Sequence, residues 1–181
     1  MSSLGAGNKG VEVAKITRAL DRNIERKAVD LARVAMIGLS YRGYYNFYIA
    51  TVEPRIEVAI TSCWFPATSA AKDAVTEGLS IDITSPDQVA LLATLPTRIQ
   101  VGIQDKLPPI EAVRRTMTQA RRHYVAVGKP ELFDYEEFDG GLERRGEVAW
   151  PFLAKYPKPA RSSMPVRYRC RWQGYSKTPS D

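Results

Sequence analysis

Apolar residues recur at helical spacing near the start of the chain. They are Ile16, Leu20, Ile24, Ala28, Leu31 and Ala35, at steps of three or four. That spacing places them on one face of a helix. The pattern predicts a long helix over residues 11–37, and Gly38 is suited to end it.

The next segment, residues 44–64, is rich in tyrosine, isoleucine, valine and threonine, which suit a pleated surface. Ile56, Val58 and Ile60 alternate with other residues, as in a half-buried strand. Pro54 would interrupt a helix and fits a turn between two strands. The segment therefore predicts a β-hairpin.

Shorter elements follow in alternation. Residues 69–77 predict a helix ended by Gly78, and the LSIDIT that follows is a candidate strand. The tetrapeptide SPDQ, which starts at Ser85, has the residues of a helix start, and the helix is expected to run to about Thr94. Residues 98–104 alternate apolar residues with polar ones or glycine and predict a strand.

The clearest helix is predicted over residues 109–127. Its apolar positions are Ile110, Val113, Met117, Ala120, Tyr124 and Val127, and Gly128-Lys129-Pro130 ends it. The predicted fold is a single mixed α/β or α+β domain with a long N-terminal helix, a β-hairpin and an extended C-terminal arm. A mostly helical body is the alternative if residues 44–64 are not strands.

The expected organisation has four parts. Residues 1–10 form a flexible lead, residues 11–128 the globular body, residues 129–149 an acidic connector, and residues 150–181 a basic extension rich in proline and aromatic residues. The charge of the chain supports this division. The net charge is +6, and residues 150–181 hold seven basic side chains against one acidic, so they account for all of it. The electric field of such a cationic end acts mainly on the molecules that it contacts.

Motifs that would indicate catalysis or a cofactor are weak. GAGNKG, from Gly5 to Gly10, has the spacing of a dinucleotide fingerprint, but four residues before it are too few for the strand that the fingerprint requires. His123 is the only histidine, and with Cys63 and Cys170 it does not complete a standard zinc site. No catalytic residue, cofactor or metal is therefore expected.

Two further observations bear on the setting of the protein. No run of about 18 apolar residues is present, so no membrane span is expected, and the first residues lack the apolar core of a secretory signal. Two distant cysteines do not make a disulfide framework, which favours a reducing compartment. Whether Cys63 pairs with Cys170 stays open.

Opposite charges lie close together in the second half of the chain. The arginines of the helix at 109–127 are Arg114, Arg115, Arg121 and Arg122. Residues 131–147, which follow, are strongly acidic. The arginine face is able to bind phosphate, but pairing with the acidic run is the preferred interpretation because the two are within about a Debye length.

The last segment, RYRCRWQGYSKTPSD, alternates arginine with aromatic residues and predicts a short strand with one cationic face. Its candidate partner-binding residues are Arg167, Tyr168, Arg169, Arg171, Trp172 and Tyr175. Arginine, tyrosine and tryptophan are enriched in protein interfaces, and the same residues are able to stack on bases and hold phosphates.

The leading functional prediction is a non-catalytic structural or accessory subunit of a large multi-protein assembly, docked through its C-terminal arm. A supernumerary subunit of an organellar (mitochondrial) complex and a virion or tail component both fit. The alternative is a nucleic-acid-binding protein, ribosomal or otherwise, that uses the arm and the arginines of the helix at 109–127. An enzyme ranks last, because no group of nucleophile, base and orienting residue is recognisable.

Overall fold

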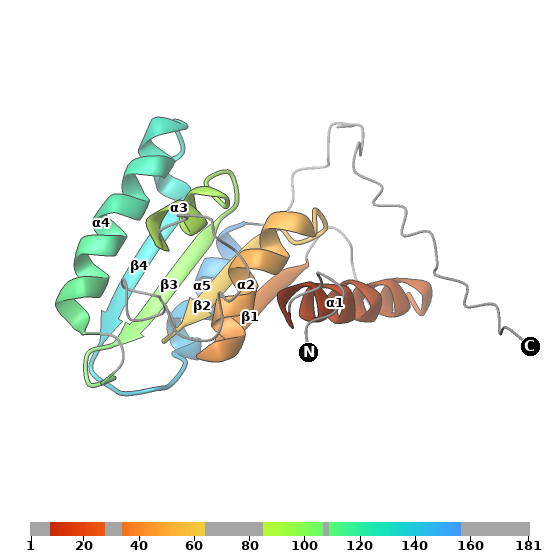
Figure 1. The fold of residues 1–181 in the computed structure, drawn as a ribbon, viewed down its shortest axis with the longest axis horizontal. Helices are drawn as coiled ribbons and strands as arrows, with labels where there is room; N and C mark the ends of the chain where they lie inside the picture. The colour runs from red at the N-terminus through yellow and green to blue at the C-terminus, as the bar shows by residue number, and fades with distance from the viewer. Residues whose placement is uncertain (1–7, 28–33, 64–84, 107–108, 157–181) are drawn as a thin grey trace, which may run out of the picture.

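The computed structural model describes residues 8–27, 34–63, 85–106 and 109–156. Strands and helices alternate along these residues (Figure 1). In chain order they are α1 (Asn8–Glu25), β1 (Ala35–Leu39), α2 (Tyr41–Val52), β2 (Val58–Ser62), α3 (Ser85–Ala90), β3 (Thr97–Gly102), α4 (Ile110–Ala126), a 3-10 turn (Pro130–Leu132), β4 (Phe133–Phe138) and α5 (Gly146–Lys155).

The four strands form one parallel sheet in the order β1-β2-β3-β4. Each crossover between neighbouring strands therefore returns the chain to the edge of the sheet where strands begin. The predicted α/β class is confirmed. All the strands end at the same edge, so residues that are far apart in the sequence meet there.

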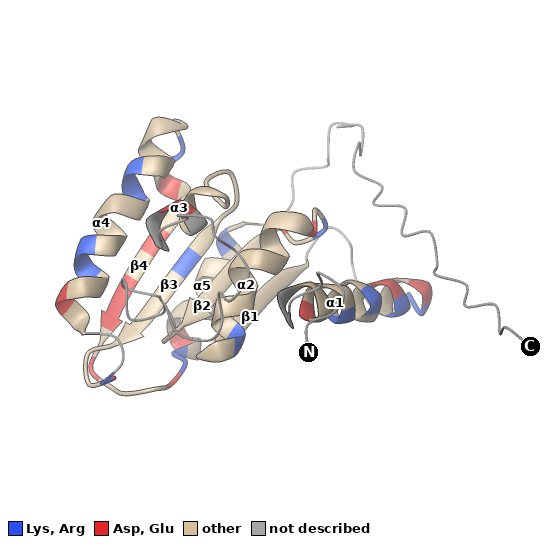
Figure 2. Cartoon of the chain, viewed as in Figure 1, with Lys and Arg blue, Asp and Glu red and all other residues tan. Residues whose placement is uncertain are grey.

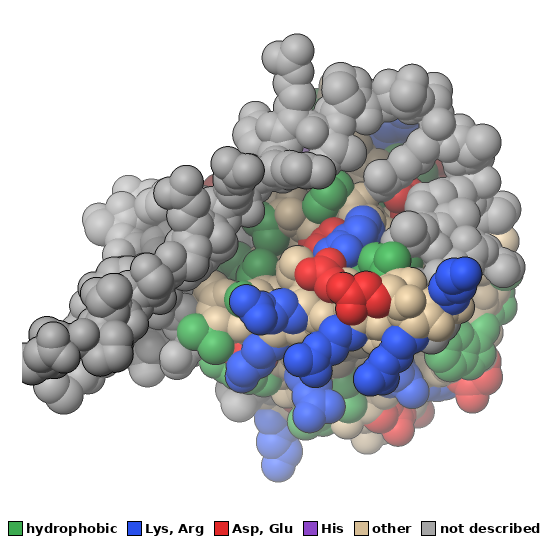
Figure 3. Space-filling model, turned by 90° about the vertical axis from the view of Figure 1, so that its right-hand side faces the viewer, with side chains coloured by type: hydrophobic (Ala, Val, Ile, Leu, Met, Phe, Trp, Pro, Cys, Tyr) green, Lys and Arg blue, Asp and Glu red, His purple; other side chains and the backbone are tan. Residues whose placement is uncertain are grey.

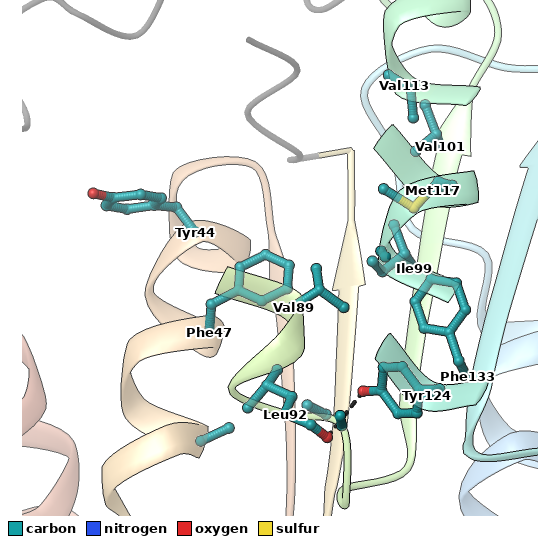
Figure 4. Close-up of a cluster of buried hydrophobic side chains, with 14 of the residues drawn as sticks. Tyr44, Phe47, Val89, Leu92, Ile99, Val101, Val113, Met117, Tyr124 and Phe133 are labelled. Carbon is teal, nitrogen blue, oxygen red and sulfur yellow. Dashed lines mark hydrogen bonds between the residues drawn. The ribbon is translucent and has the colours of Figure 1, made fainter. Parts of the chain in front are cut away.

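Helices cover both faces of the sheet. On one face α2, α3 and α4 enclose the main core, in which Phe47, Val89, Ile99 and Tyr124 are buried (Figure 4). The hydroxyl of Tyr124 donates to the carbonyl oxygen of Leu92 at 3.0 Å. On the other face α5 packs on β2 and β3.

The two central strands are buried along their whole length, polar residues included. A parallel strand between two helical layers has no solvent face. The predicted strand at 98–104 is confirmed as β3, but its alternation reflects two covered faces and not one exposed face. Pro109 precedes α4, and the predicted helices at Ser85 and at 109–127 are confirmed as α3 and α4, although α3 ends at Ala90.

The predicted hairpin is wrong. The tyrosine-rich segment forms the helix α2, and β2 pairs with β1 in parallel. The tyrosines of this segment lie at helical spacing. The ring of Tyr41 contacts that of Tyr45, and the ring of Tyr44 contacts that of Tyr48, so both pairs are four residues apart, as neighbours on a helix are. Tyr44, Phe47 and the rest of the buried side of α2 then reach the core.

The predicted long helix is also too long. α1 ends at Glu25, and Ala35–Leu39 forms β1. An apolar run of this length is compatible with a helix or a buried strand, and periodicity alone does not separate them. Residues 129–149, expected to be an acidic connector, contain β4 and the start of α5, so the sheet continues beyond residue 128. The predicted helix at 69–77 and the LSIDIT strand lie outside the described residues.

Candidate active site

The carboxyl ends of the parallel strands bring four segments to one edge of the sheet. Ser40 follows β1, Cys63 follows β2, Asp105 comes shortly after β3, and residues 139–145 connect β4 to α5. In open α/β sheets this edge is where ligands bind.

Ser40 occupies the turn between β1 and α2 in a rare backbone conformation. Its φ is 56° and its ψ is −130°, a region that side-chain-bearing residues seldom adopt. The turn is held by two backbone hydrogen bonds. The Ser40 N–H donates to the Ser62 oxygen at 2.9 Å, and the Tyr44 N–H donates to the Ser40 oxygen at 3.2 Å.

Gly38 allows the sharpness of this turn. A Cβ at residue 38 would lie 2.6 Å from the carbonyl oxygen of Arg42 and 2.7 Å from the nitrogen of Gly43, both backbone atoms. The first turn of α2 therefore approaches β1 more closely than any larger residue at position 38 permits.

The side chain of Ser40 is half-buried, and its hydroxyl has no hydrogen-bond partner among the residues that the structure describes. It stands where the positive end of α2 begins, and the backbone N–H groups of the first helical turn have no partner within the helix. A strained serine between a strand and a helix is the geometry of a nucleophile elbow, which exposes the hydroxyl above the sheet.

The connection after β4 is held against the elbow through Cys63. Its thiol donates to the carbonyl oxygens of Glu143 at 3.1 Å and Gly141 at 3.3 Å. Burial raises the pKa of the Cys63 thiol, so it stays protonated and keeps donating. Cys63 directly follows Ser62, which binds the Ser40 N–H, so this connection and the elbow are close neighbours.

Gly102 brings the same connection close to β3. A Cβ there would lie 2.5 Å from the carbonyl oxygen of Gly140 and closer still to that of Gly141. The Asp105 N–H donates to the Gly102 oxygen at 3.1 Å, which turns the chain after β3. Asp105 is therefore placed at the same edge as Ser40.

A polar network fixes the strands beneath this edge, on the side of α5. Ser62 donates to Gln100 at 2.9 Å, and Gln100 donates to Glu136 at 2.9 Å and to the carbonyl oxygen of Arg145 at 3.0 Å. The buried Arg98 pairs with Glu136 at 2.8 Å and with Asp134. The network joins β2, β3, β4 and the start of α5, so the residues after β4 are held in place from below.

His123 lies at the opposite edge. α4 returns from the end of β3 to the start of β4, and His123 is in its last turn (Figure 1). It is 3.9 Å from Asp87 of α3. Since β3 has six residues, this places His123 about 20 Å from the carboxyl edge. The only histidine of the sequence is therefore remote from Ser40.

The predicted pairing of the arginine face with the acidic run is confirmed for Arg114, which contacts Glu137 at 2.6 Å and Glu111 at 2.5 Å. Figure 2 shows the basic residues of α4 beside the acidic residues of β4. Arg115, Arg121 and Arg122 are exposed on α4. Their role in partner binding stays a prediction.

The other predicted binding residues lie outside the described residues, and their role also stays a prediction. They are Arg167, Tyr168, Arg169, Arg171, Trp172 and Tyr175. Within the described ranges no group of three or more histidine, cysteine or acidic side chains is arranged to hold a metal. No helix in those ranges is apolar and long enough to cross a bilayer.

Sequence reasoning missed Ser40. The segment Gly38-Leu39-Ser40-Tyr41-Arg42 matches the nucleophile-elbow pattern G-x-S-x-G except at its last position, where arginine replaces glycine. The pattern is informative only between a strand and a helix. Residues 11–37 were expected to be one helix, so no strand was expected before Ser40.

No family model matches the sequence, and no curated protein matches it significantly. Solved structures do share the fold. A carbohydrate esterase family 15 glucuronoyl esterase from Caldicellulosiruptor kristjansonii superposes with a TM-score of 0.65 at 16% identity, over 94% of this chain and 57% of that one.

Two more esterases are similar. The methylesterase BT1017 gives a TM-score of 0.62 at 13% identity, over 81% of this chain and 34% of that one. A promiscuous CE15 esterase from a marine bacterial metagenome gives 0.62 at 15% identity, over 84% and 49%. This chain thus spans about half the length of these proteins or less, and at these identities the likeness is one of fold.

These comparisons contradict the prediction of a non-catalytic structural or accessory subunit, whether organellar or virion. Solved structures with this fold include several esterases. The prediction that the chain is not an enzyme is wrong for the same reason. It rested on the lack of a recognisable nucleophile, and the turn at Ser40 has the backbone geometry of a nucleophile elbow.

Proposed function

We propose that this protein hydrolyses carboxylic esters and that Ser40 is the nucleophile. The observation that carries the proposal is the backbone of Ser40, strained at φ 56° between β1 and α2 with its hydroxyl free of hydrogen bonds in the described part. Strain of this kind persists where the surrounding structure enforces it, and it is concentrated at functional sites. The esterases that share the fold make carboxylic esters the first substrates to test.

In the proposed reaction the Ser40 oxygen bonds to the acyl carbon of the ester. The bond from that carbon to the alcohol oxygen breaks, and the hydroxyl proton of Ser40 leaves with the alcohol. Water then cleaves the acyl group from Ser40 and restores the hydroxyl. The backbone N–H of Tyr41, the residue after the nucleophile, is the donor that this turn offers to the oxyanion.

The general base is where this chain departs from a complete triad. Triad members in proteins with this elbow follow the order serine, acid, histidine. Asp105 after β3 has the place of the acid. After β4 the connection 139–145 contains no histidine, and Leu142 within it is 57% exposed. Residues 139–145 therefore supply no imidazole to Ser40. Removal of one triad member leaves about 10³–10⁴-fold catalysis over water.

The first experiment is hydrolysis of 4-nitrophenyl acetate by the full chain, with intact mass after treatment with a fluorophosphonate. Because 4-nitrophenolate is a good leaving group, this ester does not require a strong general base. We expect slow hydrolysis and one phosphonate per chain, both lost in Ser40→Ala. Thr118→Ala, on the exposed side of α4, is the control and keeps both. Hydrolysis or labelling that survives in Ser40→Ala would contradict the proposal.

A further inference from the structure

The apolar stripe of α1 is only partly covered. Val13 packs against the main core and Leu20 and Ile24 are half-buried, whereas Ile16 is 38% exposed. By contrast α4, of similar length, buries six residues in the core. An amphipathic helix of this kind normally covers its apolar face. In Figure 1 α1 extends past β1, at the edge of the sheet.

The outer edge of β1 beside it is apolar as well. The strand reads Ala-Met-Ile-Gly-Leu and pairs only with β2 among the described strands. Solvent-facing edge strands usually carry charges or proline, which block pairing with another chain. β1 has neither. Of its five residues only Gly38 is buried, whereas every residue of β2 is buried.

The backbone of β1 shows which groups face outward. The N–H of Ser40 donates to the Ser62 oxygen at the end of β2, and the carbonyl oxygen of Val34 accepts from the N–H of Glu57, just before β2. Because the direction alternates along a strand, the N–H and carbonyl groups of Ala35, Ile37 and Leu39 point away from β2. These are the groups that a further strand would bind.

We propose that β1 pairs with β1 of a second copy of this chain, in antiparallel orientation about a two-fold axis at Ile37. Ile37 then faces Ile37 of the second copy, and Ala35 faces its Leu39, which satisfies about six outward hydrogen bonds. Every cross-strand pair is apolar, so no like charges meet.

The other edge of the sheet does not fit this arrangement. A two-fold axis at Tyr135 of β4 would place Asp134 opposite Glu136 of the second copy, and like charges directly opposite are destabilising. Around α1 charges of both signs are present. Figure 3, which views that side of the molecule, shows basic side chains grouped around a few acidic ones. An apolar strand edge with a mixed charged rim is typical of a protein interface.

Sedimentation equilibrium of the full chain tests the proposal, since the mass of a homodimer depends on concentration. We expect a dimer at about 100 µM chain that dissociates on dilution. Ala35→Lys places an exposed charge at the edge and is expected to raise the dissociation constant at least about tenfold. Ala126→Lys, an exposed alanine of α4, is the matched control and leaves it unchanged.

Hydrogen exchange of the unmodified chain gives a second readout, independent of how the variants fold. The amides of Ile37 and Leu39 are expected to become protected as the concentration rises. A chain that stays monomeric at about 100 µM overturns the proposal. So does a dimer that Ala35→Lys and Ala126→Lys affect equally, or one in which these amides exchange at the same rate at every concentration.

Discussion

Replacing Ser40 with glycine separates the backbone strain of the turn from its chemistry. At φ 56° and ψ −130° a residue with a Cβ is strained by about 1–3 kcal/mol, whereas glycine is not. Glycine also gives the unfolded chain more conformational freedom, which lowers the free energy of unfolding by about 0.4–1 kcal/mol. The Ser40 hydroxyl has no hydrogen-bond partner in the described part, so little else is lost.

The net effect is a gain of about 1 kcal/mol in the free energy of unfolding of Ser40→Gly. For a chain of this length it corresponds to a rise of about 2–4 °C in Tm. Ser40→Ala is the matched control, because alanine keeps the Cβ and therefore the strain. The proposed hydrolysis should be absent from both variants, so stability and activity move in opposite directions only in Ser40→Gly.

The assay is urea unfolding of the three proteins followed by circular dichroism, with Tm from a thermal scan. At an ordinary strand or helix position glycine is less stable than alanine by up to about 1 kcal/mol. The expected order here is the reverse. If Ser40→Gly unfolds at the same urea concentration as Ser40→Ala or below it, the strain argument is wrong, and with it the main support for Ser40 as the nucleophile.

Three further changes test other parts of the structure. Gly38→Ala brings a Cβ to 2.6 Å from the Arg42 oxygen, so we expect a loss of about 2–4 kcal/mol in urea unfolding; a variant as stable as the parent chain would show that the turn is not tight. Burial raises the pKa of the Glu53 carboxyl, but hydrogen bonds from Arg55 outweigh this and leave it lowered. The pairing of Glu53 with Arg55 therefore stabilises the fold at pH values above the ordinary pKa of a glutamate. This stabilisation is lost as the pH falls through the lowered pKa of Glu53 in the folded chain. Arg55→Met leaves the Glu53 carboxylate buried without its guanidinium partner. We expect it to lower the free energy of unfolding by about 3 kcal/mol at pH 7 and by less toward pH 4, as measured by urea unfolding across pH. The control Arg115→Met should lower it little at any pH. Leu142→His is expected to raise 4-nitrophenyl acetate hydrolysis at least about tenfold with a new ionisation near pH 6.5, whereas Leu142→Gln should not; equal rates for the two would place residue 142 out of reach of Ser40.

Local sequence signals predicted β3 and the helices on either side of it, but not β4. The strand at 98–104 and the helix at 109–127 each have an apolar pattern that predicts one kind of element. The sequence at Ser85 has the residue types that favour a helix start. The contact between Arg114 and Glu137 was also predictable, because the two charged segments are close in the sequence.

The first half was decided by packing. Ala35–Leu39 extends the apolar pattern of α1, yet it becomes a strand because β2 offers its backbone a parallel partner. The aromatic residues of α2 suit a strand by composition but lie on a helix, since its buried side contacts α3 and the sheet. Tertiary contacts overrode both local preferences.

The sequence by itself determined that an α/β domain forms, that α3, β3 and α4 follow one another, and that it contains one histidine. Only the tertiary structure decided that Ser40 follows a strand, that residues after four separate strands share one edge, and that His123 lies at the other. The physical reason is that the direction of parallel strands brings distant residues together, and a sequence pattern records neighbours along the chain but not those across the sheet.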